Sequence, residues 1–228
     1  MRRGVLFVGC LLLATMASEG AWGQGGFGGI LLGAARFEVD DLNHTMARAG
    51  YQEFSADFPT IGGWGAFFGD RVLIGGSGWG MWQTRQSSTA TARLAGGVGF
   101  FDLGLTIRKT RLVNLTLLTG LGGGGMELNI VPAQLETNFG RILENPRLMA
   151  RLSSGQMLLK FGLQFDHLMA FAGEDQPPGV LLGLRVEYLL PFGEAEWKAE
   201  ESTVHGMPDF NLQGLYVSAV IGFGAKME

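Results

Sequence analysis

The residues best suited to chemistry are charged side chains placed inside otherwise apolar segments. Lys160 and Asp166 lie in one such segment, and Arg185 and Glu187 lie in the next. Successive side chains of a strand point to opposite faces, so each pair shares a face that excludes its large apolar neighbours. Two cations and two carboxylates enclosed together would form a compensated ion-pair network, because an unpaired charge in a narrow interior is costly.

Other polar residues extend this predicted interior. The full set comprises Asp102, Asn114, Thr116, Lys160, Gln164, Asp166, Arg185 and Glu187. A proton or ion path and a structural plug are both compatible with such a set. We favour the plug, because side chains just fill the interior of a closed eight-stranded barrel.

Histidine opens the alternative of an enzyme. The chain has three histidines, His44, His167 and His205. His205 lies near Ser202 and near the carboxylates of Glu200 and Glu201, so one segment supplies a base, a hydroxyl and an acid. Solvation of a charged loop accounts for the same residues. The prediction is therefore that the chain is not an enzyme, with a lipid-modifying activity at His205 kept as an alternative.

Sequence motifs for cofactors, metals and nucleic acid give no support to those functions. Residues 120–125 fit a Gly-x-Gly-x-x-Gly pattern, but residues 126–129 alternate like a strand, so the helix that would hold a pyrophosphate is missing. The single cysteine, Cys10, rules out a cysteine metal site. The net charge of −4 and the lack of a Lys/Arg cluster argue against nucleic acid. We predict no cofactor, no metal and no nucleic-acid partner.

Alternation of apolar and polar residues defines the elements that must position the charged side chains. Eight strand candidates lie near 26–38, 58–69, 71–84, 91–107, 111–124, 156–170, 179–190 and 212–224. Each can supply the ~9–11 residues of a tilted membrane-spanning strand. The predicted lipid-facing residues are Met157, Leu159, Phe161, Leu163, Phe165, Val180, Leu182, Leu184, Val186 and Tyr188.

The links between these strands form a second signal. Short links fall at 69–70 and 108–110 and a moderate one at 172–178, whereas the longer links are 39–57, 125–155 and 191–211. Short turns on one side and longer loops on the other are typical of transmembrane barrels, although the link at 85–90 is short for its side. Short helices are predicted in two outer loops, at 41–50 and around 135–143.

Two further features concern strand geometry. Within 91–107 the apolar phase changes near Phe100 and Phe101, and we expect a β-bulge there. Glycine accounts for 38 of the 228 residues, more than twice its ordinary share of about 7%. We expect these glycines to serve close backbone approach beside aromatic rings and tight curvature of a small barrel.

The N-terminus has the features of an export signal. Two arginines at positions 2 and 3 precede an apolar run, and small residues follow up to Gly23. This order is typical of a secretory signal peptide, and the run is too short for a spanning helix. The predicted domain organisation is a signal peptide at 1–23 and a single β-barrel domain at 24–228.

The chain resembles the small eight-stranded outer-membrane β-barrels of bacteria in two features. One is the alternation over 156–190, and the other is the last strand, which has one apolar face made of Leu215, Val217, Ala219, Ile221 and Phe223. That resemblance implies an all-β, antiparallel, up-and-down transmembrane barrel in the outer membrane. In that family the last strand usually closes on a terminal aromatic residue, whereas this chain continues through residues 225–228.

The predicted role is structural or interactive, with membrane lipid as one partner and envelope or surface partners reached through the outer loops. One alternative is a soluble periplasmic barrel, similar to lipocalins, that holds a hydrophobic ligand. Alternation alone does not separate the two, because it is unchanged when the inside and outside of a barrel are exchanged. The scarcity of charges within the strands favours the membrane barrel.

Overall fold

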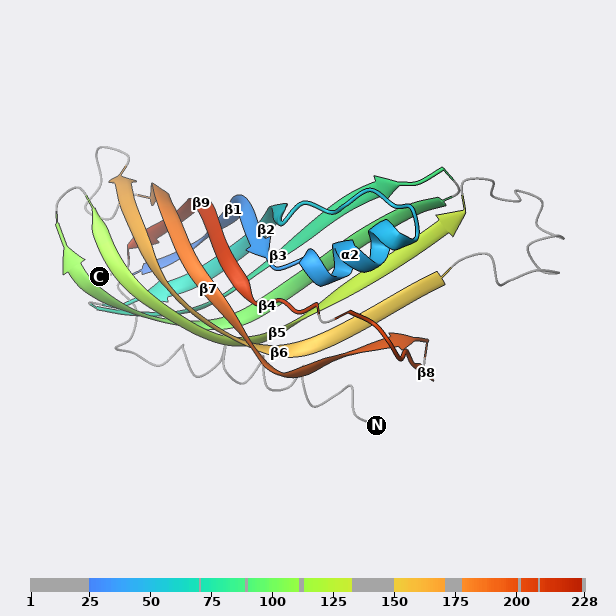
Figure 1. Ribbon diagram of the computed structural model, residues 1–228. Helices are drawn as coiled ribbons and strands as arrows, with labels where there is room; N and C mark the ends of the chain where they lie inside the picture. Colours follow the sequence, from blue (N-terminus) through green and yellow to red (C-terminus); the bar gives the residue numbers. More distant parts are fainter. Residues whose placement is uncertain are drawn as a thin grey trace, which may run out of the picture.

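A computed structural model describes residues 25–69, 71–88, 90–110, 113–132, 150–170, 178–200, 202–208 and 210–226. Its elements are β1 (Gly25–Phe37), α2 (Asp40–Arg48), β2 (Asp57–Phe68), β3 (Val72–Gln86), β4 (Ala90–Lys109), β5 (Asn114–Pro132), β6 (Ala150–Ala170), β7 (Pro178–Ala199), β8 (Ser202–Thr203) and β9 (Gly214–Lys226) (Figure 1). The predicted signal peptide at 1–23 and the predicted helix around 135–143 lie outside the described residues. No described helix has the length and apolar character needed to cross a membrane.

Eight of the strands close into one antiparallel ring. Strands β1 to β7 pair in order, β7 pairs with β9, and β9 returns to β1, while the short β8 pairs only with the end of β7. The register can be traced around the ring from each residue to its partner on the next strand. A trace that starts at Leu189 of β7 passes through Lys160, Asp102 and Phe27 and returns to β7 at Gly179, ten residues from its start. Such a stagger tilts the strands by roughly 40° to the barrel axis. The predicted eight-stranded antiparallel barrel is confirmed.

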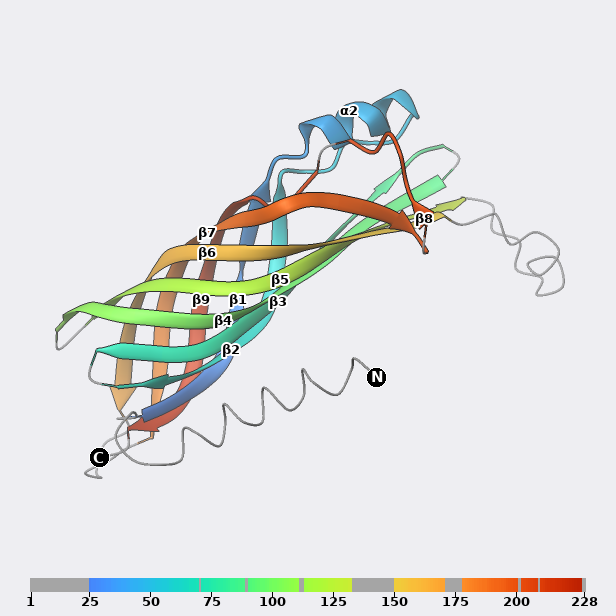
Figure 2. The same cartoon turned by 90° about the horizontal axis from the view of Figure 1, so that it is seen from below.

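The middle strands run farther than the sequence predicts. β5 continues to Pro132 and β7 to Ala199, where strand ends were expected at 124 and 190, and β6 begins at Ala150 instead of 156. Beyond the last pairs of β3 with β2 and of β7 with β9, these strands form a protruding sheet, made of 82–86, 90–97, 125–132, 150–155 and 190–199 (Figures 1 and 2). Part of what reads as loop is therefore strand, because alternation continues past the barrel.

Helix α2 lies over the inner face of the protruding sheet and confirms the helix expected at 41–50. Its Leu42 and Met46 are buried in one apolar cluster with Leu94 and Leu128 of the sheet. We call the end of the barrel that carries this helix the α2 end. The apolar cluster fills the interior at that end, and the set that forms it includes Phe37, Phe58, Trp79, Phe100, Leu158, Leu189, Trp197, Phe210, Leu212 and Tyr216.

The expected bulge at Phe100 and Phe101 is wrong. The β4–β5 register is continuous through both residues, and its irregularity lies between Thr106 and Arg108. Phe100 is buried inside the barrel, whereas Phe101 points outward and is 45% exposed. The apolar phase of β4 changes because this strand presents apolar side chains to the interior near α2 and to the exterior farther from α2.

Removal of the Asn43 side chain should loosen α2 without opening the barrel. The Asn43 amide donates to the carbonyl of Phe54 at 2.8 Å and accepts from the Phe54 N–H at 2.7 Å, in a buried position. Asn43→Ala leaves both Phe54 groups unpaired, at a cost of about 1–3 kcal/mol. We expect faster hydrogen exchange in α2 and unchanged protection in β6. Thr45→Ala, at an exposed position of the same helix, is the control, and equal exchange in the two variants would contradict the assignment.

Candidate functional site: the charged barrel interior

Lys160 is the centre of the polar interior. It lies on β6 with 1% of its surface exposed, and its ammonium group donates to Glu187 Oε1 at 2.8 Å, to Ser77 Oγ at 2.8 Å and to Asp102 Oδ2 at 3.2 Å. An ammonium group has three N–H donors, so all three are used. The Phe100 ring lies 4.9 Å from the same nitrogen and adds a cation–π contact.

Arg185 forms the second positive centre. Its Nε donates to Gln164 Oε1 at 2.6 Å, and its Nη1 lies 3.9 Å from Asp102 Oδ2. The guanidinium also lies 4.9 Å from the centre of the Trp64 ring. Asp102 therefore lies between two cations and also accepts from the Ser77 hydroxyl at 2.7 Å.

Hydrogen bonds carry the network toward the end opposite α2. Gln164 Nε2 donates to one oxygen of Asp166 at 2.9 Å, and Asn114 Nδ2 donates to the other at 3.0 Å. The network thus contains two cations and three carboxylates, and each carboxylate has a donor from a neighbouring strand or from its own strand. Arg185 Nη1 and Asp102 Oδ1 are buried without a hydrogen-bond partner and contact the network through ion pairs alone.

Seven of the eight predicted interior residues form this continuous network. Thr116 is also buried, but its hydroxyl pairs with that of Thr106 at 3.2 Å and contacts none of the ionic groups through a described hydrogen bond. Asn114 is half-buried, at the first residue of β5. The others, Asp102, Lys160, Gln164, Asp166, Arg185 and Glu187, are each 2% exposed or less.

Two members of the site escape sequence reasoning. Ser77 lies in a glycine-rich strand where alternation is weak, and only its phase with the buried Trp79 and Met81 could have revealed it. Gly120 lies between Asp102 and Lys160 in the strand register. A Cβ at Gly120 would come within 2.8 Å of Asp102 Oδ1 and of Lys160 Cε. Glycine at this position leaves room for the ion pair.

An apolar layer closes the network on the side of α2. The next inward positions toward α2 are Leu158 after Lys160, Leu189 after Glu187, Phe100 after Asp102 and Trp79 after Ser77. All four are buried members of the apolar cluster beneath α2. The cluster covers the charged groups with buried, close-packed side chains on that side.

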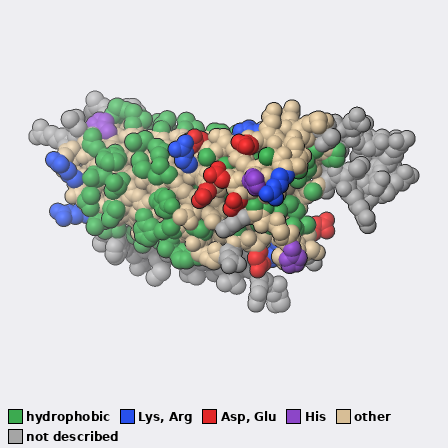
Figure 3. All heavy atoms as spheres, viewed as in Figure 1, with side chains coloured by type: hydrophobic (Ala, Val, Ile, Leu, Met, Phe, Trp, Pro, Cys, Tyr) green, Lys and Arg blue, Asp and Glu red, His purple; other side chains and the backbone are tan. Residues whose placement is uncertain are grey.

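The exterior carries the opposite chemistry. All ten predicted lipid-facing residues lie outward; Met157, Phe161, Leu163, Phe165, Leu182, Leu184 and Tyr188 are 36–56% exposed, and Leu159, Val180 and Val186 are intermediate. Exposed large apolar residues also occur on β1 to β5 and β9, including Ile30, Ile61, Val72, Leu103, Leu117 and Phe223. Figure 3 shows hydrophobic side chains over the barrel, acidic side chains gathered toward α2, and Lys or Arg side chains both there and at the opposite end.

The histidine candidates lie apart from this interior. Ser202 lies in β8 and His205 in the turn that follows, both exposed, and His167 is half-buried on β6. Glu201 falls outside the described residues. Among the described residues, no group of three or more His, Cys, Asp or Glu side chains is arranged to hold a metal ion.

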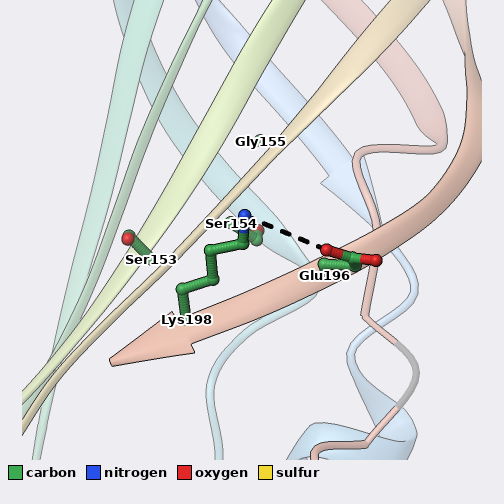
Figure 4. Close-up of a pocket in the computed structure, with 5 residues that line it drawn as sticks. All are labelled: Ser153, Ser154, Gly155, Glu196 and Lys198. Carbon is green, nitrogen blue, oxygen red and sulfur yellow. Dashed lines mark ion pairs between the residues drawn. The ribbon is translucent and has the colours of Figure 1, made fainter. Parts of the chain in front are cut away.

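Two surface cavities lie toward the α2 end. One, of about 330 Å³, is lined by Ser153, Ser154, Gly155, Glu196 and Lys198 (Figure 4). It accompanies the register shift between Gly155 and Met157, opposite which Gly193 adopts a φ of +74°. The other, of about 510 Å³, lies at the start of α2, and Glu38, Asp40 and Asp41 are among its lining residues.

Comparisons with known proteins add little to this description. No protein-family model matches the chain, and no curated protein matches it. Among solved structures, the chain is similar to the crystal structure of Ail, the attachment invasion locus protein of Yersinia pestis, with 14% identity and a TM-score of 0.44. The match covers 89% of this chain and 99% of that one. The fold assignment here rests on the closed strand register.

Replacement of Lys160 by methionine should destabilise the barrel strongly. The change leaves Glu187 and Asp102 without their main counter-charge in a buried site, a loss of about 3–5 kcal/mol. We expect a lower midpoint for urea unfolding of the detergent-solubilised protein. Addition of Glu187→Gln to Lys160→Met should recover part of the loss, because it removes one uncompensated carboxylate. A single variant as stable as the parent would refute the role of Lys160.

A smaller change tests the glycine beside the ion pair. Gly120→Ala should lower the free energy of unfolding by about 1–3 kcal/mol, because the new methyl group displaces Asp102 or Lys160. Gly99→Ala is the matched control, since a Cβ there meets nothing within 4 Å. The melting temperatures of the Gly120→Ala and Gly99→Ala variants are compared by monitoring thermal unfolding through the gel shift between folded and unfolded forms. Equal melting temperatures would contradict the crowding at Gly120.

Proposed function

We propose that the chain is a bacterial outer-membrane β-barrel with a structural or envelope-interaction role, and that its charged interior acts as a plug. The observation that carries the proposal is the inversion of polarity across the wall. On β6, Lys160 is 1% exposed and faces the interior, whereas its neighbour Phe161 is 48% exposed and faces outward. Hydrocarbon accommodates such an exterior, which water would not.

The dimensions of the apolar exterior support the same proposal. On β6 the exposed apolar positions run from Met157 to Met169. At the strand tilt given above, this distance corresponds to about 30 Å along the barrel axis, close to the thickness of a bilayer core. Closure of the ring leaves no open edge in the belt, as hydrocarbon requires. Trp82 and Tyr188, both exposed, lie toward its α2 end, where amphipathic rings favour the interface.

The interactive part of the role falls to the α2 end. There the protruding sheet, α2 and the acidic cavity at Glu38, Asp40 and Asp41 form a surface beyond the apolar belt. Because the apolar cluster holds α2 against the sheet, this surface is preformed. A rigid platform anchored by a membrane barrel suits contact with envelope components or surface partners.

A charge placed on the belt separates membrane insertion from a soluble barrel. Leu163→Arg puts a cation at an exposed apolar position, which costs about 2–4 kcal/mol near the bilayer midplane. In water the same outward arginine would be close to neutral. The expected result is lower stability of the variant refolded into lipid vesicles, measured by urea titration.

Gln86→Arg is the control, since Gln86 is exposed on the protruding sheet and its partner on β4 is the neutral Thr91. It should leave stability in vesicles unchanged. If Leu163→Arg and Gln86→Arg were equally harmless, and the parent stayed in solution without detergent, the membrane proposal would fall in favour of a soluble barrel with a hydrophobic ligand.

A further inference from the structure

The outward-facing glycines of β3 to β6 form a patch, and packing within the chain leaves four of them unexplained. Inward glycines are crowded: a Cβ at Gly122 would lie 2.0 Å from the Gly99 carbonyl oxygen. On the outward side, a Cβ at Gly80, Gly97 or Gly155 would meet no atom closer than 3.6 Å, and one at Gly99 would meet nothing within 4 Å. The barrel could therefore carry side chains at these positions.

These glycines are neighbours on the wall. Gly80 pairs with Gly97, which pairs with Gly125 and then with Gly155, and the next row contains Gly78, Gly99 and Gly123. Within these two rows Gly78, Gly123 and Gly125 are needed by the wall itself, since a Cβ there would lie 2.7–3.3 Å from a backbone carbonyl oxygen. Exposed Trp82 and Met157 border the patch on β3 and β6, and exposed Phe101 and Leu121 border it on the side away from α2. Between β3 and β6 the shallow niche measures about 14 Å across.

Charged and amide groups line the edge of the niche toward α2. Arg93 and Asn129 are directly paired across β4 and β5, and Asn129 pairs with Arg151 of β6. One row nearer the niche, Glu127 accepts from Asn129 and from Arg151 Nε at 2.8 Å. Lys198, which contributes to the adjoining cavity of Figure 4, pairs with Glu196 at 3.9 Å.

The charges along this edge favour an anionic headgroup. Arg93, Arg151 and Lys198 oppose Glu127 and Glu196, so the cations exceed the carboxylates by one. Glu127 accepts from both Nε and Nη2 of Arg151, so it competes with an anionic ligand for that side of the guanidinium and leaves Nη1 to the ligand. The planar fork of an arginine guanidinium matches two oxygens of a phosphate group, as it matches those of a carboxylate.

We propose that this niche binds a phosphorylated glycolipid of the surrounding membrane, with its phosphate at Arg93 and Arg151 and its sugar against the glycine wall. The niche is wider than a single phosphate, and a wall without side chains admits a flat saccharide close to the backbone. Acyl chains would lie along Phe101 and Leu121, which continue the apolar belt. This inference rests on the proposed membrane location.

The test measures lipid binding by native mass spectrometry of the folded barrel in detergent, with diphosphorylated lipid A as the probe. Arg93→Gln with Arg151→Gln should weaken binding at least tenfold. Glu127→Gln should tighten it, since a competing carboxylate is removed. Gly97→Leu should weaken it by filling the niche, while Ala34→Leu, at an exposed position of β1, leaves it unchanged.

Three results would overturn the proposal. They are no binding of lipid A by the parent, equal binding by the Arg93 and Arg151 double variant, and competition by millimolar inorganic phosphate equal to that by the lipid, which would reduce the niche to an ion site. Phosphatidylcholine should bind at least tenfold more weakly. A barrel that inserts into vesicles but shows no preference for lipid A defeats this inference alone, whereas one that fails to insert defeats the proposed function.

Discussion

The ammonium group of Lys160 is the interaction on which the interior depends. Its three hydrogen bonds join β6 to β7, β4 and β3, so one side chain ties together four of the eight barrel strands. Charges this deeply buried are tolerated only when every one has partners, because desolvation would otherwise outweigh attraction. Glycine at position 120 is part of the same constraint, since any larger residue would enter the space between Lys160 and Asp102.

Around this network the barrel has two kinds of interior. Near α2 the inward side chains are apolar and pack beneath a helix and the 210–212 segment, as in the core of a soluble domain. Farther from α2, the inward side chains combine the charged network with a second buried apolar cluster, which includes Phe27, Leu31, Trp64, Leu73, Leu118, Leu181 and Val220, and the outward side chains are apolar. The β4 strand passes from one environment to the other without a break in register, and this explains why its apolar phase shifts where no bulge exists.

The ring of strands could be predicted from the sequence because it follows from period-two alternation, and the same alternation places the charged set on the face opposite the large apolar residues. Prediction from the sequence failed at other places for different reasons. Ser77 lies among glycines, which have no polarity to alternate, and the protruding ends of β5 and β7 alternate like any strand but lie where loops were expected. The role of Gly120 could not be read at all, because it depends on which residues of β4 and β6 face it across two registers.

The central claim is that the outward face of β6 and β7 contacts hydrocarbon while the charges face a closed interior. Methyl NMR with two paramagnetic agents, one carried on lipid acyl chains and one soluble in water, tests it most directly in lipid nanodiscs. The methyl groups of Leu163 and Leu184 should be broadened by the acyl-chain agent and untouched by the water-soluble one. Broadening of those methyl groups by the water-soluble agent alone would contradict the account.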